Sequence, residues 1–184
     1  VILDEIAFVV DTRATAASDE WQRAFDASFT PDRLARVRQS VRQLITHQFP
    51  SGNLEAIDES PASDRLVQWC HGAPGLIFTI AALLRLSRWS HEFRSDSSME
   101  WAQRIRRDLC VPVDSPEFAF MERAMDRAGD NVALRGMSAK GVGLCHGVCG
   151  HIYALLRLHR HYAESRNTGE GKERWLRNAH EFAK

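Results

Sequence analysis

The chain has 184 residues, with 24 basic and 24 acidic side chains and therefore no formal net charge. A hydrophobic content of 44% with 26% charged residues is typical of a globular protein and excludes wholesale disorder. The balanced charge argues against a dedicated nucleic-acid binder, which carries excess positive charge. No apolar run reaches the roughly 18 residues of a membrane-spanning helix, and the acidic residues within Val1–Val10 are unlike a signal peptide.

Apolar residues recur at helical spacing along most of the chain, and no strand of more than a few residues is expected. Pro31 suits the first turn of a helix, with Thr30 as its cap. Pro112 and Pro116 are expected to close a polar, arginine-rich segment, and Gly129 to end the helix that follows it. The fold class is therefore all-α, with helices expected at 20–29, 31–47, 76–89, 98–108, 118–129, 150–163 and 172–182.

The most informative feature is an internal repeat, whose two copies lie 75 positions apart. Cys70-His71-Gly72-Ala73-Pro74-Gly75 returns as Cys145-His146-Gly147-Val148-Cys149-Gly150, and the match continues into the helix after each copy. Stacked helical hairpins place equivalent turns on the same edge of an assembly, so the two Cys-His turns are expected to meet. The glycines of both copies allow sharp turns and close approach of the helix starts.

Thiolates and imidazoles in a set of three or four are typical of a Zn²⁺ site. The candidate ligands are Cys70, Cys145, and one or both of His71 and His146; the spacing alone does not choose between three and four ligands. A helix start near each cysteine is expected to lower the thiol pKa and so favour the thiolate. The alternative is that both cysteines are small packing residues, but repetition of the whole motif favours metal binding.

At these residues the chain resembles the lanthionine synthetase C-like (LanC-like) proteins. The segments 69–75 and 143–147 are similar to the two zinc motifs of that family. Two further segments resemble its eukaryotic branch, namely Phe49-Pro50-Ser51-Gly52-Asn53 and Lys140-Gly141. The resemblance covers about residues 31–164. It implies an α/α toroid of six helical hairpins, with Zn²⁺ at one end held by Cys70, Cys145 and His146 and a fourth position open to water or a thiol.

The resemblance also implies a reaction. The thiol of glutathione in eukaryotic members, or of a peptide cysteine in bacterial ones, adds to dehydroalanine or dehydrobutyrine in a protein or peptide and forms a thioether. Zinc deprotonates the thiol, and an acid must return a proton to the resulting enolate. Lys140 is the candidate for binding a glutathione carboxylate, with an exposed loop lysine as the alternative. His71 is the candidate proton donor, with a packing imidazole as the alternative.

The chain also departs from the family pattern. Nothing before Cys70 matches the family's upstream His-Gly-x-x-Gly motif, which supplies the expected acid, or its upstream aspartate. The long interval between the zinc motifs predicts an insertion at about 90–116. We therefore expect 1–184 to be a partial LanC-like toroid domain, a C-terminal portion incomplete at both ends. These residues do not close a barrel alone, which counts against catalysis by the isolated chain.

Two other functions are alternatives. One is a catalytically silent module that binds zinc and glutathione and acts through partners. The other is a helical-toroid glycosidase, which needs paired carboxylates, and the available ones are Asp58, Glu59 and Asp64. A cytoplasmic location is expected, because four cysteines are too few for a disulfide scaffold. Membrane association is not indicated, although a peripheral position at the plasma membrane is the lesser alternative.

Side chains close to the motifs carry further predictions. Trp69 is expected to pack beneath the metal loop, Cys149 to lie in the core, and Cys110 to be unreactive. The helix at 150–163 is expected to present a basic, solvated surface, with contact to anionic lipid as the lesser alternative; that surface would be formed by His151, His159, His161, Arg157 and Arg160.

Overall fold

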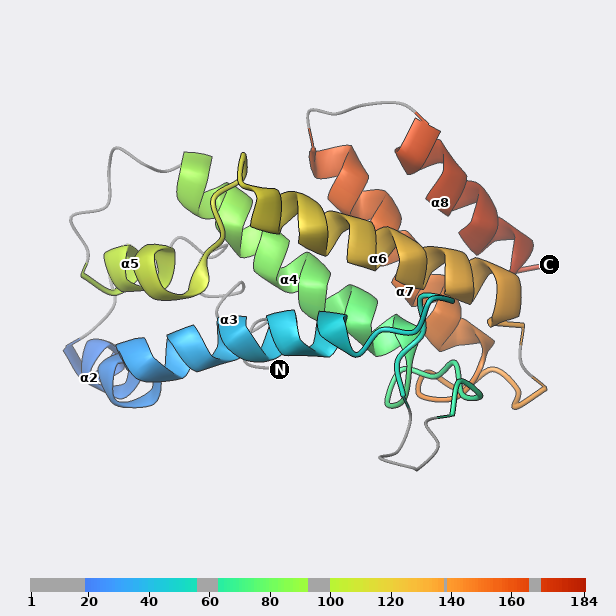
Figure 1. The fold of residues 1–184 in the computed structure, drawn as a ribbon, viewed down its shortest axis with the longest axis horizontal. Helices are drawn as coiled ribbons and strands as arrows, with labels where there is room; N and C mark the ends of the chain where they lie inside the picture. Colours follow the sequence, from blue (N-terminus) through green and yellow to red (C-terminus); the bar gives the residue numbers. More distant parts are fainter. Residues whose placement is uncertain (1–18, 56–62, 93–99, 138, 166–169) are drawn as a thin grey trace. The chain divides into compact units, whose positions relative to one another are not determined.

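The computed structural model describes residues 19–55, 63–92, 100–137, 139–165 and 170–184. Every regular element in these ranges is a helix (Figure 1), so the all-α prediction is confirmed for them. None of the described helices is long and apolar enough to cross a membrane. The closed toroid and the insertion at 90–116 stay predictions. The helices are α2 (Asp19–Ser28), α3 (Pro31–Thr46), α4 (Ala73–Glu92), α5 (Glu100–Arg104), η1, a π-helical turn (Ile105–Leu109), α6 (Pro116–Arg135), α7 (Val148–Glu164) and α8 (Glu170–Glu181).

The described residues of Val1–Gln43 and Ala82–Ala119 form one compact unit, and those of Leu44–Ala81 and Phe120–Lys184 form a second. In the first unit, the ring of Trp101 on α5 lies edge-on to Phe25 of α2, with centroids 5.7 Å apart, and stacks on Trp89 of α4. This unit also contains Cys110, which is buried. Burial raises the pKa of its thiol, as expected of an unreactive cysteine.

Two helices begin with a proline that follows a hydroxyl side chain. Thr30 Oγ1 accepts a hydrogen bond from the Arg33 amide at 3.4 Å, and Pro31 is the first residue of α3, as predicted. Ser115 Oγ accepts from the amide of Phe118 at 3.2 Å, one turn into α6. The segment that Pro112 and Pro116 were predicted to close ends before Pro116, which is the first residue of α6. The first helical residue has no amide partner to lose and therefore suits proline.

The second unit holds the candidate site. In it, α7 and α8 pack as a helical hairpin (Figure 1). Helix α6 does not end at Gly129 as predicted but continues to Arg135. A Cβ at Gly129 would lie 2.5 Å from both Leu158 of α7 and Trp175 of α8. The glycine therefore allows close helix packing instead of ending the helix. Trp175 is only 1% exposed, and truncating such a side chain costs about 3–5 kcal/mol.

Candidate metal centre

The two copies of the repeat form equivalent turns before α4 and α7. A Cβ on Gly75 would collide with the carbonyl of Trp69, and a Cβ on Gly150 would collide with the carbonyl of Leu144. Trp69 and Leu144 are themselves equivalent positions of the repeat. Both turns therefore fold back on the chain in the same way, and the predicted role of the glycines in close backbone approach is confirmed.

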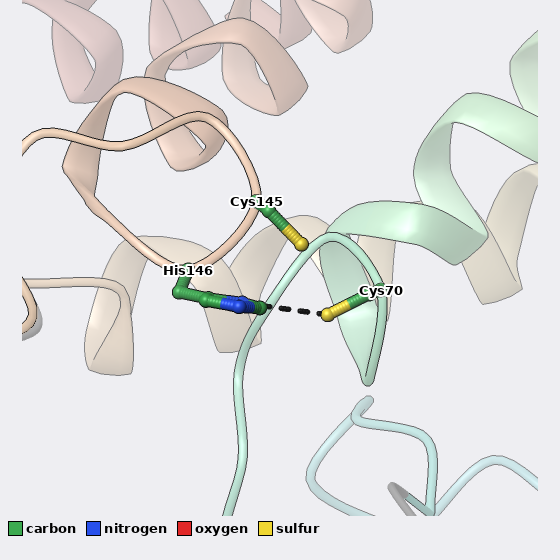
Figure 2. A group of neighbouring side chains, drawn as sticks. All are labelled: Cys70, Cys145 and His146. Atoms are coloured by element: carbon green, nitrogen blue, oxygen red, sulfur yellow. Dashed lines mark hydrogen bonds between the residues drawn. The ribbon is translucent and has the colours of Figure 1, made fainter.

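The two turns lie side by side, as Figure 2 shows. The amide of Trp69 donates a hydrogen bond to the carbonyl of Cys145 at 2.9 Å. Cys70 Sγ lies 3.4 Å from Nδ1 of His146 (Figure 2). The ligand atoms of Cys70, Cys145 and His146 all lie within 4.8 Å of one another, a group that could hold a metal ion. The predicted meeting of the two Cys-His turns is therefore confirmed.

The chemistry of these three side chains fits zinc. Two thiols and an imidazole suit a borderline-soft cation and do not suit the hard cations that prefer oxygen. Around a tetrahedral zinc ion, a sulfur and a nitrogen ligand are about 3.5 Å apart, which is close to the separation of Cys70 Sγ and His146 Nδ1. Both cysteines are free thiols. Cys70 and His146 are exposed, so a further ligand can reach the group.

The pKa of the Cys70 thiol is raised above its ordinary value. Desolvation of the sulfur is the main cause, and the thiol of Cys145 adds to it through hydrogen bonding and charge repulsion. The ammonium group of Lys140 acts in the opposite direction. The predicted lowering of the pKa by the helix start was therefore wrong for Cys70, because desolvation of its sulfur, together with the thiol beside it, outweighs the groups that lower the pKa. A cation held by both sulfurs would offset this repulsion.

A buried asparagine holds the Cys70 turn against the start of α4. Asn53 is 0% exposed. Its Oδ1 accepts from the Ala73 amide at 2.8 Å, and its Nδ2 donates to the Leu66 carbonyl at 2.9 Å. The first amides of a helix have no partner within the helix, so Asn53 caps α4 from a loop distant in sequence. It thereby fixes the chain on both sides of Cys70.

The carboxylate of Asp64 is the charged centre of this loop. It accepts hydrogen bonds from Ser51 at 2.6 Å, Asn53 at 2.8 Å and Arg135 at 2.7 Å. Burial raises the pKa of Asp64, but the hydrogen bonds outweigh burial and hold the pKa below its ordinary value. Neither Asn53 nor Arg135 is predicted from the sequence as a site residue. The available signal was the family-like segment that ends at Asn53.

The remaining predicted site residues are placed as follows. Lys140 and His71 are exposed, and His71 lies outside the three-residue donor group. Trp69 is 50% exposed, so the prediction that it packs beneath the metal loop was wrong. Its backbone amide, not its ring, joins the two turns. Of the three carboxylates considered for the glycosidase alternative, Asp64 is hydrogen-bonded to Ser51, Asn53 and Arg135. Asp58 and Glu59 lie outside the described residues.

The predicted basic surface of α7 was wrong for two of its histidines. His151 and His161 are only 1% and 3% exposed. Nε2 of His151 lies 2.7 Å from the carbonyl of Val67, and Nε2 of His161 lies 2.9 Å from a carboxylate oxygen of Glu122. Each of these buried imidazoles has a hydrogen-bond partner at Nε2, which offsets part of the cost of burying a polar ring. Cys149 is half-buried, at the edge of the core and not within it.

The sequence matches the family of lanthionine synthetase C-like proteins over residues 27–183. The chain therefore belongs to this family. It is 30% identical over 124 residues to glutathione S-transferase LANCL1 of Danio rerio and 31% identical over 125 residues to LanC-like protein GCL1 of Arabidopsis thaliana. Each match covers 67% of this chain but only 23% and 22% of the relatives. The chain thus spans less than a quarter of the length of these two relatives.

The Cys70 turn requires glycine at position 72. Its φ is +126°, and a Cβ there would lie 2.6 Å from both Asn53 Oδ1 and the Leu66 carbonyl oxygen. Gly72→Ala is expected to lower the free energy of unfolding by at least about 2 kcal/mol, measured by urea denaturation with circular dichroism. Gly143→Ala is the control, because its Cβ would meet nothing within 4 Å, and a change within about 0.5 kcal/mol is expected. Equal losses in both variants would contradict this role.

The charge of Asp64 is expected to stabilise the fold in a pH-dependent way. Because its folded pKa is lowered, the contribution is present above the ordinary carboxyl pKa of about 3.9 and is lost as the pH falls through the lowered value. Asp64→Asn should therefore melt at a lower temperature than the parent at neutral pH, and the two melting temperatures should converge in acid. A difference that does not change with pH would show that the charge is not the cause.

Proposed function

We propose that this chain provides a thiol-activating zinc centre. Cys70, Cys145 and His146 hold Zn²⁺, which activates the thiol of glutathione, or of a peptide cysteine, for addition to dehydroalanine or dehydrobutyrine residues. The observation that carries this proposal is the convergence of three donor atoms within 4.8 Å from two loops. Membership of the family supports it, and a relative named glutathione S-transferase favours glutathione as the thiol.

When bound, zinc supplies the positive charge that keeps a substrate thiol deprotonated at neutral pH. Cys70 and Cys145, as thiolates, balance the charge of the ion, while His146 binds as a neutral imidazole. With the charge of the ion balanced in this way, a substrate thiol bound beside these three residues would keep its electron density and its nucleophilicity as a thiolate. The exposure of Cys70 and His146 leaves a path for that thiol to enter.

The addition itself needs no oxidant or reductant. The substrate sulfur forms a bond to the β-carbon of the dehydroamino acid, and the electrons of the carbon–carbon double bond move towards the neighbouring carbonyl. Transfer of one proton to the α-carbon completes the thioether. His71, exposed and next to Cys70 in the chain, is the proposed proton donor. Lys140, whose positive charge acts to lower the pKa of the Cys70 thiol, is the proposed partner of a glutathione carboxylate.

Metal analysis of the purified chain tests the site. We expect about one zinc per chain, lost on dialysis against a moderate chelator from each of Cys70→Ala, Cys145→Ala and His146→Ala. Cys149→Ala is the matched control, because Cys149 lies on α7 outside the donor group, and it should keep its zinc. Stoichiometric zinc in all three ligand variants would refute the site.

A peptide that contains dehydroalanine tests the reaction. We expect the zinc-loaded chain to accelerate the addition of glutathione, detected as a thioether by mass spectrometry, and Lys140→Ala to raise the KM for glutathione about two- to fivefold with little change in kcat. Lys184→Ala, which removes a lysine paired with Glu181, should change neither.

Cysteamine gives a second control for Lys140, because it is a thiol without a carboxylate. Lys140→Ala should leave its KM unchanged, and an equal rise in KM for both thiols would contradict the proposed carboxylate contact. Zinc binding without any acceleration of the addition would reject the enzyme in favour of the silent binding module.

A further inference from the structure

His151 departs from the repeat in which it lies. Its equivalent in the first copy is Leu76. Both side chains are buried, with exposed fractions of 1% and 2%. An apolar side chain therefore satisfies this position in one copy, whereas the other copy buries an imidazole, which is costly unless its polar atoms are paired. The imidazole of His151 therefore needs a hydrogen-bond partner that Leu76 does not need.

That partner is the carbonyl of Val67, three residues before Cys70. Nε2 of His151 lies 2.7 Å from the carbonyl oxygen. Because a carbonyl only accepts, Nε2 carries the proton, and Nδ1 has no hydrogen-bond partner among the described residues. The ring lies edge-on to Phe182, with centroids 6.5 Å apart, and a Cβ on Gly136 would lie 3.1 Å from the ring. This packing holds the imidazole in one orientation.

Besides the contact of Cys70 Sγ with His146 Nδ1, two hydrogen bonds to backbone carbonyls join the segment that carries Cys70 to the second copy of the repeat within the described residues. One runs between backbone groups, from the Trp69 amide to the Cys145 carbonyl. The other requires a particular side chain, since it comes from the imidazole of His151 on α7. Helix α7 directly follows the loop that carries Cys145 and His146. His151 therefore ties the Cys70 segment to the helix that positions the other two candidate ligands.

We infer that His151 is a positioning residue for the group of Cys70, Cys145 and His146. Its Nε2–H···O=C bond to Val67 keeps the sulfur of Cys70 within bonding reach of an ion shared with the other two side chains. His151 itself contacts neither metal nor substrate in this role. The test of this inference by zinc affinity rests on the proposed function. Two other tests, the rate of disulfide formation and the tautomer of His151, need no metal.

Substitutions at position 151 separate the hydrogen bond from the packing. His151→Leu copies the residue of the first repeat and removes the donor, whereas His151→Gln keeps a donor close to the position of Nε2. We expect His151→Leu to weaken zinc affinity about tenfold or more in competition with a chromophoric chelator, and His151→Gln to stay within about threefold of the parent. Equal affinity in the parent and a folded His151→Leu variant overturns the inference.

His159→Leu is the matched control. His159 also lies on α7, and its Nδ1 is 2.9 Å from a backbone carbonyl, that of Lys172 at α8. Removing this hydrogen bond should leave the zinc affinity unchanged, although it removes the same kind of interaction from the same helix. A tenfold loss of affinity in His159→Leu would overturn a specific role for His151.

Two measurements distinguish failure of this inference from failure of the proposed function. Absence of zinc from the parent chain refutes the metal site alone. The rate at which oxidised glutathione converts Cys70 and Cys145 into a disulfide, releasing two glutathione thiols, depends on the distance between the sulfurs and needs no metal. We expect this rate to be lower in His151→Leu than in His151→Gln, and equal rates overturn the inference.

The second measurement needs no variant. Nitrogen-15 spectra of the parent report which ring nitrogen of His151 is protonated. The neutral tautomer with the proton on Nε2 supports the inference, and a proton on Nδ1 overturns it.

Discussion

The hydrogen bond from the Trp69 amide to the Cys145 carbonyl joins the two copies of the repeat beside their ligand candidates. Because it runs between backbone groups, it holds the two turns in one register whatever side chains surround them. The same bond keeps the turns that carry Cys70 and Cys145 next to each other. A donor group ordered by the fold loses less conformational entropy when it binds a ligand than one assembled from free loops.

The charges around the site have opposite effects on two acidic groups. Asp64 is stabilised as a carboxylate by Arg135 and by hydrogen-bond donors from its own loop, so the pKa of this group is lowered. Desolvation and the neighbouring thiol of Cys145 raise the pKa of the Cys70 thiol, and Lys140 only partly offsets this. The charge of Asp64 is thus balanced by Arg135 within the fold. The two thiols have no such balance, and a divalent cation would stabilise their deprotonated forms.

All the described ligand candidates and their supports lie in one compact unit, made of residues within Leu44–Ala81 and Phe120–Lys184. The supports act at successive distances from the ligands. The Trp69 amide contacts the Cys145 loop directly, Asn53 caps α4 beyond Cys70, and Arg135 holds Asp64 in place. Polar contacts with groups that are close in space but distant in sequence let a loop with little regular structure keep a defined geometry beside a helix start.

The sequence by itself determined the helical class, the repeat and a set of four ligand candidates, because helical periodicity and a duplicated Cys-His-Gly motif are local patterns. The repeat alone did not choose between His71 and His146; the family resemblance favoured His146. The sequence also determined the start of α3, since the Thr30–Pro31 cap involves only neighbouring residues. Only the tertiary structure decided the role of Asn53, the continuation of α6 past Gly129 and the burial of His151. Each of these depends on a partner distant in sequence, a helix amide, a tryptophan ring or a carbonyl oxygen, and no local pattern records which distant group the fold will bring alongside.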